Sequence, residues 1–374
     1  MKPTIDTLSI EGFRALRRIR IEGLGRANLI TGRNNTGKSS VLEALRILAS
    51  NASPPVISNI LHYREEDIGE SEETARSAES EGFSLVSSLF SGFPSLGETS
   101  RPIAISASGS AQSKRLSLSL GRFTEQRNPD GTRRLIPHDP GLLPETEPLL
   151  RIVLETDEGR RPLPLDYFSR YRTALSARGE WPGGQREPCV FVSPYASENT
   201  SALGSLWDKV ALSDLEEHVV RALRLISPDV EAVSMIGGEG PRQSRIAIVR
   251  IANTVRPVPL RSLGDGVNRL FGIVLSLVNA KDGLLLIDEV ENGLHHGVQM
   301  DVWRAIFDLS RRLNVQVFAT SHSWDSVEAF QKVSADDPEV GVLIRLSRKG
   351  DEIIPTLFRE HELAIATRDR IEVR

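Results

Sequence analysis

The stretch of residues 32–40, which reads GRNNTGKSS, constrains this chain more than any other. It matches the phosphate-binding loop pattern G-x-x-x-x-G-K-[ST] at every fixed position. An apolar run at residues 27–31 precedes it, and apolar residues at helical spacing follow it. The two glycines let successive backbone N–H groups turn inward on phosphate oxygens, and the following helix directs its positive end to the same place. The stretch therefore predicts a loop that binds a nucleoside triphosphate.

Two side chains of this loop have predicted roles. Lys38 is expected to reach the β- and γ-phosphates, and the hydroxyl of Ser39 to occupy one position on Mg²⁺. The residues expected to line the nucleotide site are Gly32, Asn34, Asn35, Thr36, Gly37, Lys38, Ser39 and Ser40.

Composition narrows the remaining possibilities. The 374 residues carry a formal charge of −4, so any contact with nucleic acid must come from a local basic patch. A single cysteine, Cys189, excludes an intrachain disulfide and a cysteine-based zinc site, and is typical of the cytosol. No run of 18 apolar residues and no signal-peptide core occur, so we expect a soluble, cytoplasmic protein without a membrane partner.

Two adjacent carboxylates end a second apolar run. Residues 283–287 read as a fully buried strand, and Asp288 and Glu289 follow it at the sheet edge where open α/β sheets bind ligands. In isolation, two acids that merely end a strand would be the favoured interpretation. With a phosphate loop upstream, we expect Asp288 to bind Mg²⁺ beside Ser39, and Glu289 to orient and deprotonate the attacking water.

Three further segments carry candidate site residues, and one of these residues, His322, follows a strand that ends at the same edge. A strand at residues 315–319 ends before His322, which could hydrogen-bond the γ-phosphate and the attacking water. A turn at residues 263–266 opens a helix whose apolar positions begin at Val267. Arg14 precedes a basic run, which is either a solvated strand face or a contact for phosphate or another polyanion.

The rest of the chain is expected to frame these motifs. Residues 4–31 alternate as an antiparallel lead-in, and residues 61–186, with an acidic Ser-rich stretch and a Pro-rich link, predict an inserted variable sub-domain. The nucleotide-binding head would then comprise residues 1–60 and 187–374. Other expected elements are a helix at 212–226, paired strands at 230–236 and 244–251 around a turn at 237–240, and edge strands at 340–346 and 352–357.

The chain resembles the heads of ABC-class ATPases in this set of motifs. Within that class it is similar to the branch that contains SMC proteins, RecF and the OLD (overcoming lysogenization defect) proteins. The motifs that carry the resemblance are Phe13-Arg14, the loop 32–40, the turn Leu263-Gly-Asp-Gly266, the strand and carboxylates 284–289, Glu291-Asn-Gly-Leu-His295, and Thr320-Ser-His322.

The resemblance implies an α/β fold of the P-loop NTPase, ABC-ATPase type, with a mixed, mainly parallel sheet core and an antiparallel β lead-in. It implies Mg²⁺-dependent ATP hydrolysis, with ATP and Mg²⁺ as cofactors. It also implies a composite site, in which two protomers hold ATP between the phosphate loop of one and the signature motif of the other. Leu263, Gly264, Asp265 and Gly266 would form that signature in trans.

The signature departs from the L-S-G-G pattern of the class. Gly264 replaces the usual serine, and Asp265 sets a carboxylate near a phosphate, which Coulomb repulsion should weaken unless Asp265 turns back to cap its own helix. Hydrolysis is therefore expected to be slow or to depend on a partner. The Gln-loop of the class has no clear counterpart in this sequence.

Three functions fit an ATPase head of this kind. A transporter motor is disfavoured by the altered signature and by the Phe13-Arg14 entry. A DNA-repair or chromosome-associated ATPase of SMC/RecF type is the alternative, with possible DNA binding, although the long coiled coil is absent. The favoured function is an OLD-like ATPase in anti-phage defence. Because 52 residues follow His322 (374 minus 322), too few for a Toprim nuclease domain, the effector is expected on a separate polypeptide.

Overall fold

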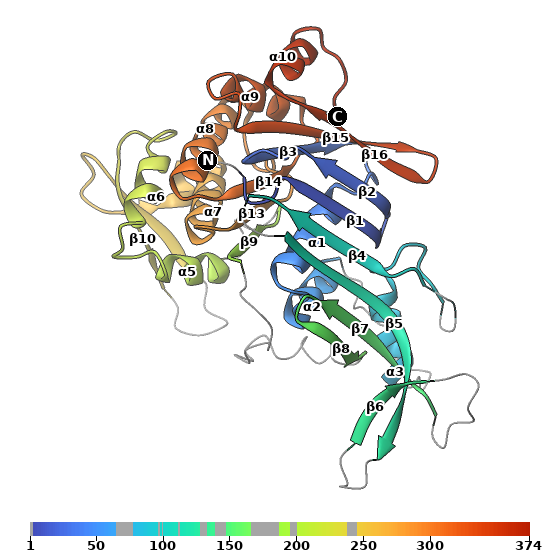
Figure 1. Cartoon of the computed structure of the whole chain (residues 1–374). Helices are drawn as coiled ribbons and strands as arrows, with labels where there is room; N and C mark the ends of the chain where they lie inside the picture. Colours follow the sequence, from blue (N-terminus) through green and yellow to red (C-terminus); the bar gives the residue numbers. More distant parts are fainter. Residues whose placement is uncertain are drawn as a thin grey trace, which may run out of the picture.

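The computed structural model describes most of the chain. The described residues are 3–64, 78–95, 98, 100–110, 113–127, 133–138, 147–165, 187–194, 200–237 and 245–374. Within them the chain forms two large sheets, a small three-stranded sheet and the helices that cover them (Figure 1). No helix in these ranges is long and apolar enough to cross a bilayer.

The central sheet has six strands, and five of them are parallel. Its order is β16-β15-β3-β14-β13-β9, and β16 is the antiparallel strand at one edge. The strands are β3 (Ala27–Gly32), β9 (Cys189–Val192), β13 (Leu284–Ile287), β14 (Gln316–Thr320), β15 (Gly341–Lys349) and β16 (Glu352–Phe358). The short strands β3, β13 and β14 are buried at every position, and most of their residues are apolar. Their buried polar residues are Asn28, Thr31, Gln316 and Thr320.

Alternate residues of the central sheet contribute to two separate cores. One face, with Leu29 and Ile287, packs against helices α7 (Asp265–Asn279), α8 (His296–Arg312) and α9 (Trp324–Ser334). The other face, with Ile30 and Leu286, packs against α1 (Lys38–Ala49). Helix α1, which begins at the predicted phosphate loop, therefore lies between the two large sheets.

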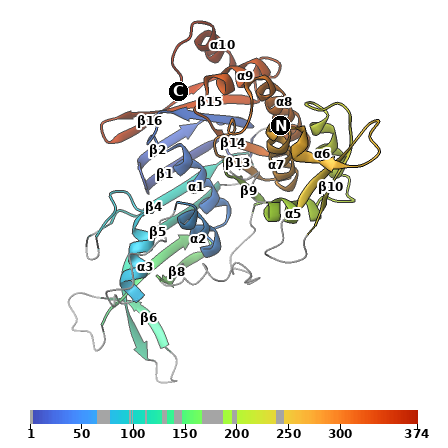
Figure 2. The same ribbon diagram turned by 180° about the vertical axis from the view of Figure 1, so that it is seen from behind.

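The second sheet is antiparallel. Its order is β2-β1-β4-β5-β7-β8, and β6 pairs with β5. The strands are β1 (Thr7–Phe13), β2 (Leu16–Glu22), β4 (Ile103–Ser108), β5 (Ser113–Arg127), β6 (Arg133–Pro137), β7 (Leu149–Thr156) and β8 (Gly159–Pro164). Helices α1 and α2 (Pro54–Tyr63) cover one face (Figure 2), and α3 (Ala78–Ser87) packs into the same core. The division at residue 61 stays a prediction, but β4, β5, β7 and β8 extend the sheet that β1 and β2 begin.

The remaining elements flank α7 or follow β16. They are α5 (Thr200–Asp208), α6 (Glu216–Leu223), β10 (Val230–Ile236), β11 (Ile246–Ile251), β12 (Val258–Pro259), the 3₁₀ turn η2 (Leu260–Leu263) and α10 (Glu360–Arg368). Strands β10 and β11 pair as predicted, and residues 238–240 of their predicted turn lie outside the described residues.

Two predictions about secondary structure were wrong. The helix predicted at 212–226 is confined to Glu216–Leu223, because Leu212 is fully exposed with a left-handed backbone and no apolar face begins there. Strand β15 is not an edge strand, since it lies between β16 and β3 and its first four residues are buried. The predicted α/β fold with a mixed parallel core and an antiparallel lead-in is confirmed.

Candidate nucleotide site

The loop between β3 and α1 has the backbone of a phosphate cradle. Gly32 has φ 143°, and a Cβ there would contact the carbonyl oxygen of Leu346 and lie 2.7 Å from the Thr36 hydroxyl. Gly37 is left-handed with φ 83° and forms the N-cap of α1, where no side chain caps the helix. The first turn of α1 contains no acidic residue. The free N–H groups and the positive end of the helix are thus available to an anion.

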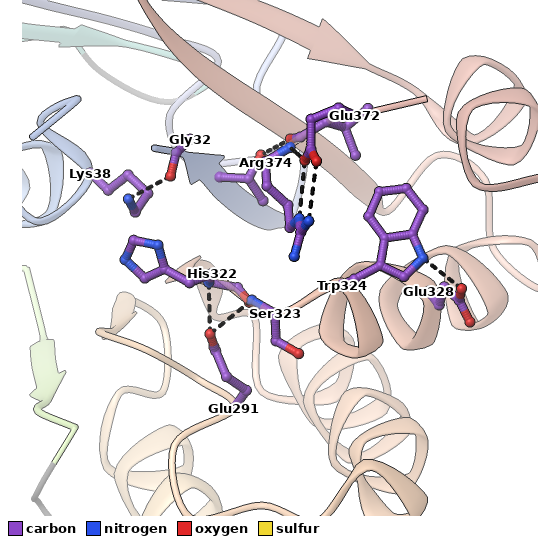
Figure 3. A network of polar contacts seen from close by, with 12 residues as sticks. Gly32, Lys38, Glu291, His322, Ser323, Trp324, Glu328, Glu372 and Arg374 are labelled. Atoms are coloured by element: carbon purple, nitrogen blue, oxygen red, sulfur yellow. Dashed lines mark hydrogen bonds and ion pairs between the residues drawn. The ribbon is translucent and has the colours of Figure 1, made fainter. Parts of the chain in front are cut away.

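Lys38 lies folded over this loop. Its ammonium donates to the carbonyl oxygen of Gly32 at 2.8 Å (Figure 3) and to that of Arg33 at 3.0 Å. Burial lowers the pKa of Lys38 to about 8, and the nearby carboxylates of Asp288, Glu289 and Glu291 offset part of that effect. A bound phosphate would supply the negative charge that this buried ammonium lacks.

We expect nucleotide binding to weaken as the pH rises through the pKa of Lys38. Below about 8 the free protein holds the charged ammonium, and above it the amine is mostly neutral and must take up a proton to pair with phosphate. Affinity for Mg-ATP should therefore fall about tenfold between pH 7 and pH 9. Calorimetry at pH 8.5 in two buffers of different ionisation enthalpy should detect uptake of a proton. Binding without proton uptake and without pH dependence would contradict this prediction.

Asp288 and Glu289 lie where β13 ends, at the carboxyl edge of the parallel sheet. The Asp288 carboxylate accepts hydrogen bonds from the hydroxyls of Thr320, at 2.6 Å, and Ser39, at 3.2 Å. The Thr320 hydroxyl also accepts from the backbone N–H of Glu289 at 2.8 Å. Glu289 itself is half-buried and left-handed, with φ 48°. The phosphate loop, β13 and β14 are therefore joined at one carboxylate.

The oxygen atoms at this point suit Mg²⁺. Mg²⁺ prefers hard oxygen ligands and is usually bound through one or two protein groups together with phosphate and water oxygens. The Ser39 hydroxyl and the Asp288 carboxylate, 3.2 Å apart, are such a pair. The residues present fit the ion that the resemblance implies.

His322 follows β14 and is exposed beside the phosphate loop. It lines the main cleft and a neighbouring cavity of about 330 Å³ that also borders Gly32 and Asn34. The backbone N–H groups of His322 and Ser323 donate to the carboxylate of Glu291 at 2.6 and 3.1 Å (Figure 3). The loop after β14 is thus tied to the loop that carries Glu289.

The main cleft has a volume of about 820 Å³ and includes Arg14 and residues 34–40 in its lining. Arg14 lies close to the expected phosphate site, but its guanidinium is paired with Glu43 at 2.6 Å, and both side chains are 5% exposed. Arg64 binds the other carboxylate oxygen of Glu43 at 2.6 Å. The structure therefore places Arg14 in the cleft as a member of an ion-pair network.

The predicted signature lies at the N-terminus of α7, outside this cleft. Gly264 and Asp265 are exposed, and no residue of 260–266 is among the described residues that line the cleft. Asp265 does not cap its helix: its N-cap is Gly264, and the Asp265 carboxylate is instead paired with Arg261 at 3.3 Å on the surface. Within one chain, the signature and the phosphate loop do not share a site.

Arg269 was missed by the sequence reasoning. This side chain of α7 is 2% exposed, and its guanidinium donates to four backbone carbonyls at the ends of β9 and β13. The acceptors belong to Ser193 (2.7 Å), Pro194 (3.2 Å), Asp288 (3.4 Å) and Glu289 (3.2 Å). A charged residue among the apolar positions of α7 was the one signal in the sequence that could have indicated it.

The segment 372–374 was also missed. The hydroxyl of Thr31, the last residue before the loop, donates to the carbonyl of the buried Val373 at 2.5 Å. Arg374 pairs with Glu372 at 3.0 Å, lies 5.6 Å from the centre of the Trp324 ring, and lines the smaller cavity beside the loop (Figure 3). No motif in the sequence indicates this contact.

Comparison with known proteins indicates the class of protein to which this site belongs. Residues 197–327 match the family model described as "AAA domain, putative AbiEii toxin, Type IV TA system", and residues 1–81 match the model described as "AAA ATPase domain". A Helicobacter pylori protein named ATP/GTP phosphatase is 23% identical over 352 residues, which cover 88% of each chain. An uncharacterized protein of Methanocaldococcus jannaschii is 48% identical over 46 residues, 12% of this chain and 21% of that protein.

Solved structures agree with the fold. The head of an SMC protein bound to the C-winged helix domain of ScpA has a TM-score of 0.52 at 12% identity, and covers 97% of this chain and 100% of that one. An Smc head from Pyrococcus furiosus bound to the C-terminal domain of ScpA has a TM-score of 0.50 at 12% identity, with complete coverage of both chains. The fold is that of a P-loop ATPase head of the ABC type. The matched AAA ATPase domains and the ATP/GTP phosphatase relative identify the chain as an ATPase.

Proposed function

We propose that the cleft binds Mg-ATP with the residues that its geometry brings together. The phosphate loop and Lys38 would hold the β- and γ-phosphates, and Ser39 and Asp288 would hold Mg²⁺, which neutralises charge on the phosphates. Glu289 would orient the attacking water and take its proton, and His322 would hydrogen-bond the γ-phosphate. The hydrogen bonds that join Ser39, Asp288 and Thr320 support this assignment.

We also propose that the complete site forms between two copies of the chain. The observation that carries this proposal is that the exposed signature turn lies outside the cleft that holds the phosphate loop. ATP would then join the phosphate loop of one protomer to residues 263–266 of its partner, and hydrolysis would release them. A homodimer is the smallest assembly that satisfies this arrangement.

Complementation in trans tests the shared site. Lys38→Ala removes the lysine that the phosphate loop needs to bind phosphate. Gly266→Arg blocks the signature without backbone strain, because Gly266 has no left-handed φ and a Cβ there would make an ordinary contact with Val298 at 3.5 Å. Each variant alone should lose turnover. Mixing them should restore part of it, since one of the two sites in the mixed dimer is intact. If Gly266→Arg is as active as wild type, or if mixing restores nothing, the shared site is wrong.

For the cellular role, we propose that the ATP state of the dimer gates a separate effector, a Toprim-like nuclease, in anti-phage defence. The resemblance of the head motifs to the branch that contains the OLD proteins supports this role, and so does the match to a family model described as a putative AbiEii toxin of a type IV TA system. So does the architecture of the SMC heads, which are seen bound to domains of ScpA. Co-expression with the neighbouring genes should yield a complex whose stability depends on ATP. Absence of any complex would remove the main support for gating.

The similarity to SMC heads favours one alternative, a DNA-repair or chromosome-associated ATPase of SMC/RecF type. ATP turnover measured with and without double-stranded DNA distinguishes this alternative from the gating of a partner effector. Stimulation by DNA alone, without a partner protein, would favour the alternative.

A further inference from the structure

Phe93 is an exposed aromatic residue with an unfavourable backbone. Its side chain is 65% exposed, and its φ of 49° is left-handed, directly after the left-handed Gly92. Bulky residues rarely adopt this conformation, which costs on the order of 1 kcal/mol or more. Such strain together with an exposed ring is typical of a residue retained for binding rather than for packing.

The loop that carries Phe93 is fastened to the end of β1. The backbone N–H of Ser91 donates to the Gly12 carbonyl at 2.9 Å, and its hydroxyl donates to the Arg14 carbonyl at 2.7 Å. The N–H of Arg14 donates in turn to the Leu89 carbonyl at 2.9 Å. Phe90, which is fully buried, pairs with Phe13 across the same junction. The position of Phe93 is therefore set by the sheet that abuts the phosphate loop.

Phe93 lines the same cleft as the phosphate loop. The 820 Å³ cleft is lined by residues 34–40 of the phosphate loop, by Phe93, and by Arg14, Arg17 and Arg348. Arg17 is paired at 3.0 Å with Asp351, which also lines the cleft. A triphosphate held at the N-terminus of α1 leaves the rest of the nucleotide to extend along this cleft. Among the described residues of its lining, Phe93 supplies the phenyl ring.

We propose that Phe93 is the stacking platform for the base of the bound nucleotide. This inference rests on the proposed binding of ATP in the cleft and adds the group that recognises the base. A flat ring that is exposed, fixed in place and beside the phosphate site offers the apolar face on which a nucleobase stacks. Stacking on the base offsets the backbone strain of the loop and the exposure of the ring.

Binding of Mg-ATP compared with inorganic tripolyphosphate tests the proposal, because tripolyphosphate presents phosphates without a base. Phe93→Ala keeps a side chain with the same backbone preference and removes the ring. It should weaken Mg-ATP binding about tenfold, the size of one base–aromatic stack, and leave tripolyphosphate binding unchanged. Phe93→Trp should restore the affinity. The matched control is Leu212→Ala, which removes another exposed apolar side chain at a left-handed position, φ 62°, that does not line the cleft.

Each outcome bears on a different claim. If Phe93→Ala binds Mg-ATP as tightly as wild type, or loses ATP and tripolyphosphate affinity equally, the stacking assignment is overturned while the nucleotide site stands. If wild type binds no Mg-ATP, the proposed function fails and the stacking platform fails with it.

Discussion

Replacing Glu289 with glutamine is expected to stop turnover while leaving ATP bound. The amide retains the size of the side chain but cannot accept a proton from water, and loss of a general base typically costs 10²- to 10⁴-fold in rate. The hydrogen bond of Lys38 to the phosphate loop and the Ser39–Asp288 pair do not involve the Glu289 side chain, so affinity should be preserved. The dimer should accumulate with ATP, because hydrolysis no longer releases it. Turnover assays and mass measurement with and without Mg-ATP test both parts.

Glu291→Gln is the matched control for this experiment. Glu291 accepts the backbone N–H groups of His322 and Ser323 through one oxygen, Oε1, which an amide carbonyl can replace. This variant should keep most of its activity. If Glu289→Gln turns over ATP at the wild-type rate, or if Glu291→Gln loses as much activity as Glu289→Gln, Glu289 is not the base.

The part of the site that lies within short motifs could be predicted from the sequence. The loop at residues 32–40 follows from its glycines, because their spacing alone dictates where the backbone can turn. Asp288 was predicted beside Ser39 because parallel strands deliver their carboxyl ends to one edge, and the two side chains lie 3.2 Å apart. Their roles toward Mg²⁺ and water stay predictions.

Contacts between distant segments could not be predicted in the same way. The sequence of β15 is an apolar run followed by a turn, which predicts its antiparallel pairing with β16. No feature of the local sequence indicates that β15 also pairs with β3. The contact between Thr31 and Val373 joins residues 342 positions apart and uses a backbone carbonyl, which leaves no trace in residue type. Phe93 was missed because its significance lies in its exposure and left-handed backbone, which are properties of the folded chain.

Replacing Arg269 with methionine is expected to reduce both stability and turnover. Methionine can fill the space of the buried stem, but it removes the guanidinium donor from four carbonyls at the ends of β9 and β13. The carbonyls of Pro194 and Glu289 keep hydrogen bonds from Asn292, whereas those of Ser193 and Asp288 lose the donor that Arg269 supplies. An unsatisfied buried carbonyl costs about 1–3 kcal/mol, so a loss of about 2 kcal/mol or more in the free energy of unfolding is expected. Because burial already lowers the pKa of Arg269 to about 10, the guanidinium is retained at a cost that its hydrogen bonds must offset.

The effect on turnover should be separable from the effect on stability. Arg269 donates to the carbonyls of Asp288 and Glu289, and it does not contact the phosphate loop. It is therefore a positioning residue, and at a temperature where the variant is folded kcat should fall at least about tenfold while the Kd for Mg-ATP stays within about twofold. Arg269→Lys keeps the positive charge but offers fewer hydrogen-bond donors. Its stability and its kcat should therefore lie between those of wild type and those of Arg269→Met. Arg250→Met, at an exposed arginine paired with Glu231, should change stability by less than about 1 kcal/mol. If Arg269→Met is folded and fully active, the hydrogen bonds of Arg269 do not hold the catalytic loop, and the bonds of the Glu289 backbone to Thr320 and Asn292 maintain its left-handed conformation without them.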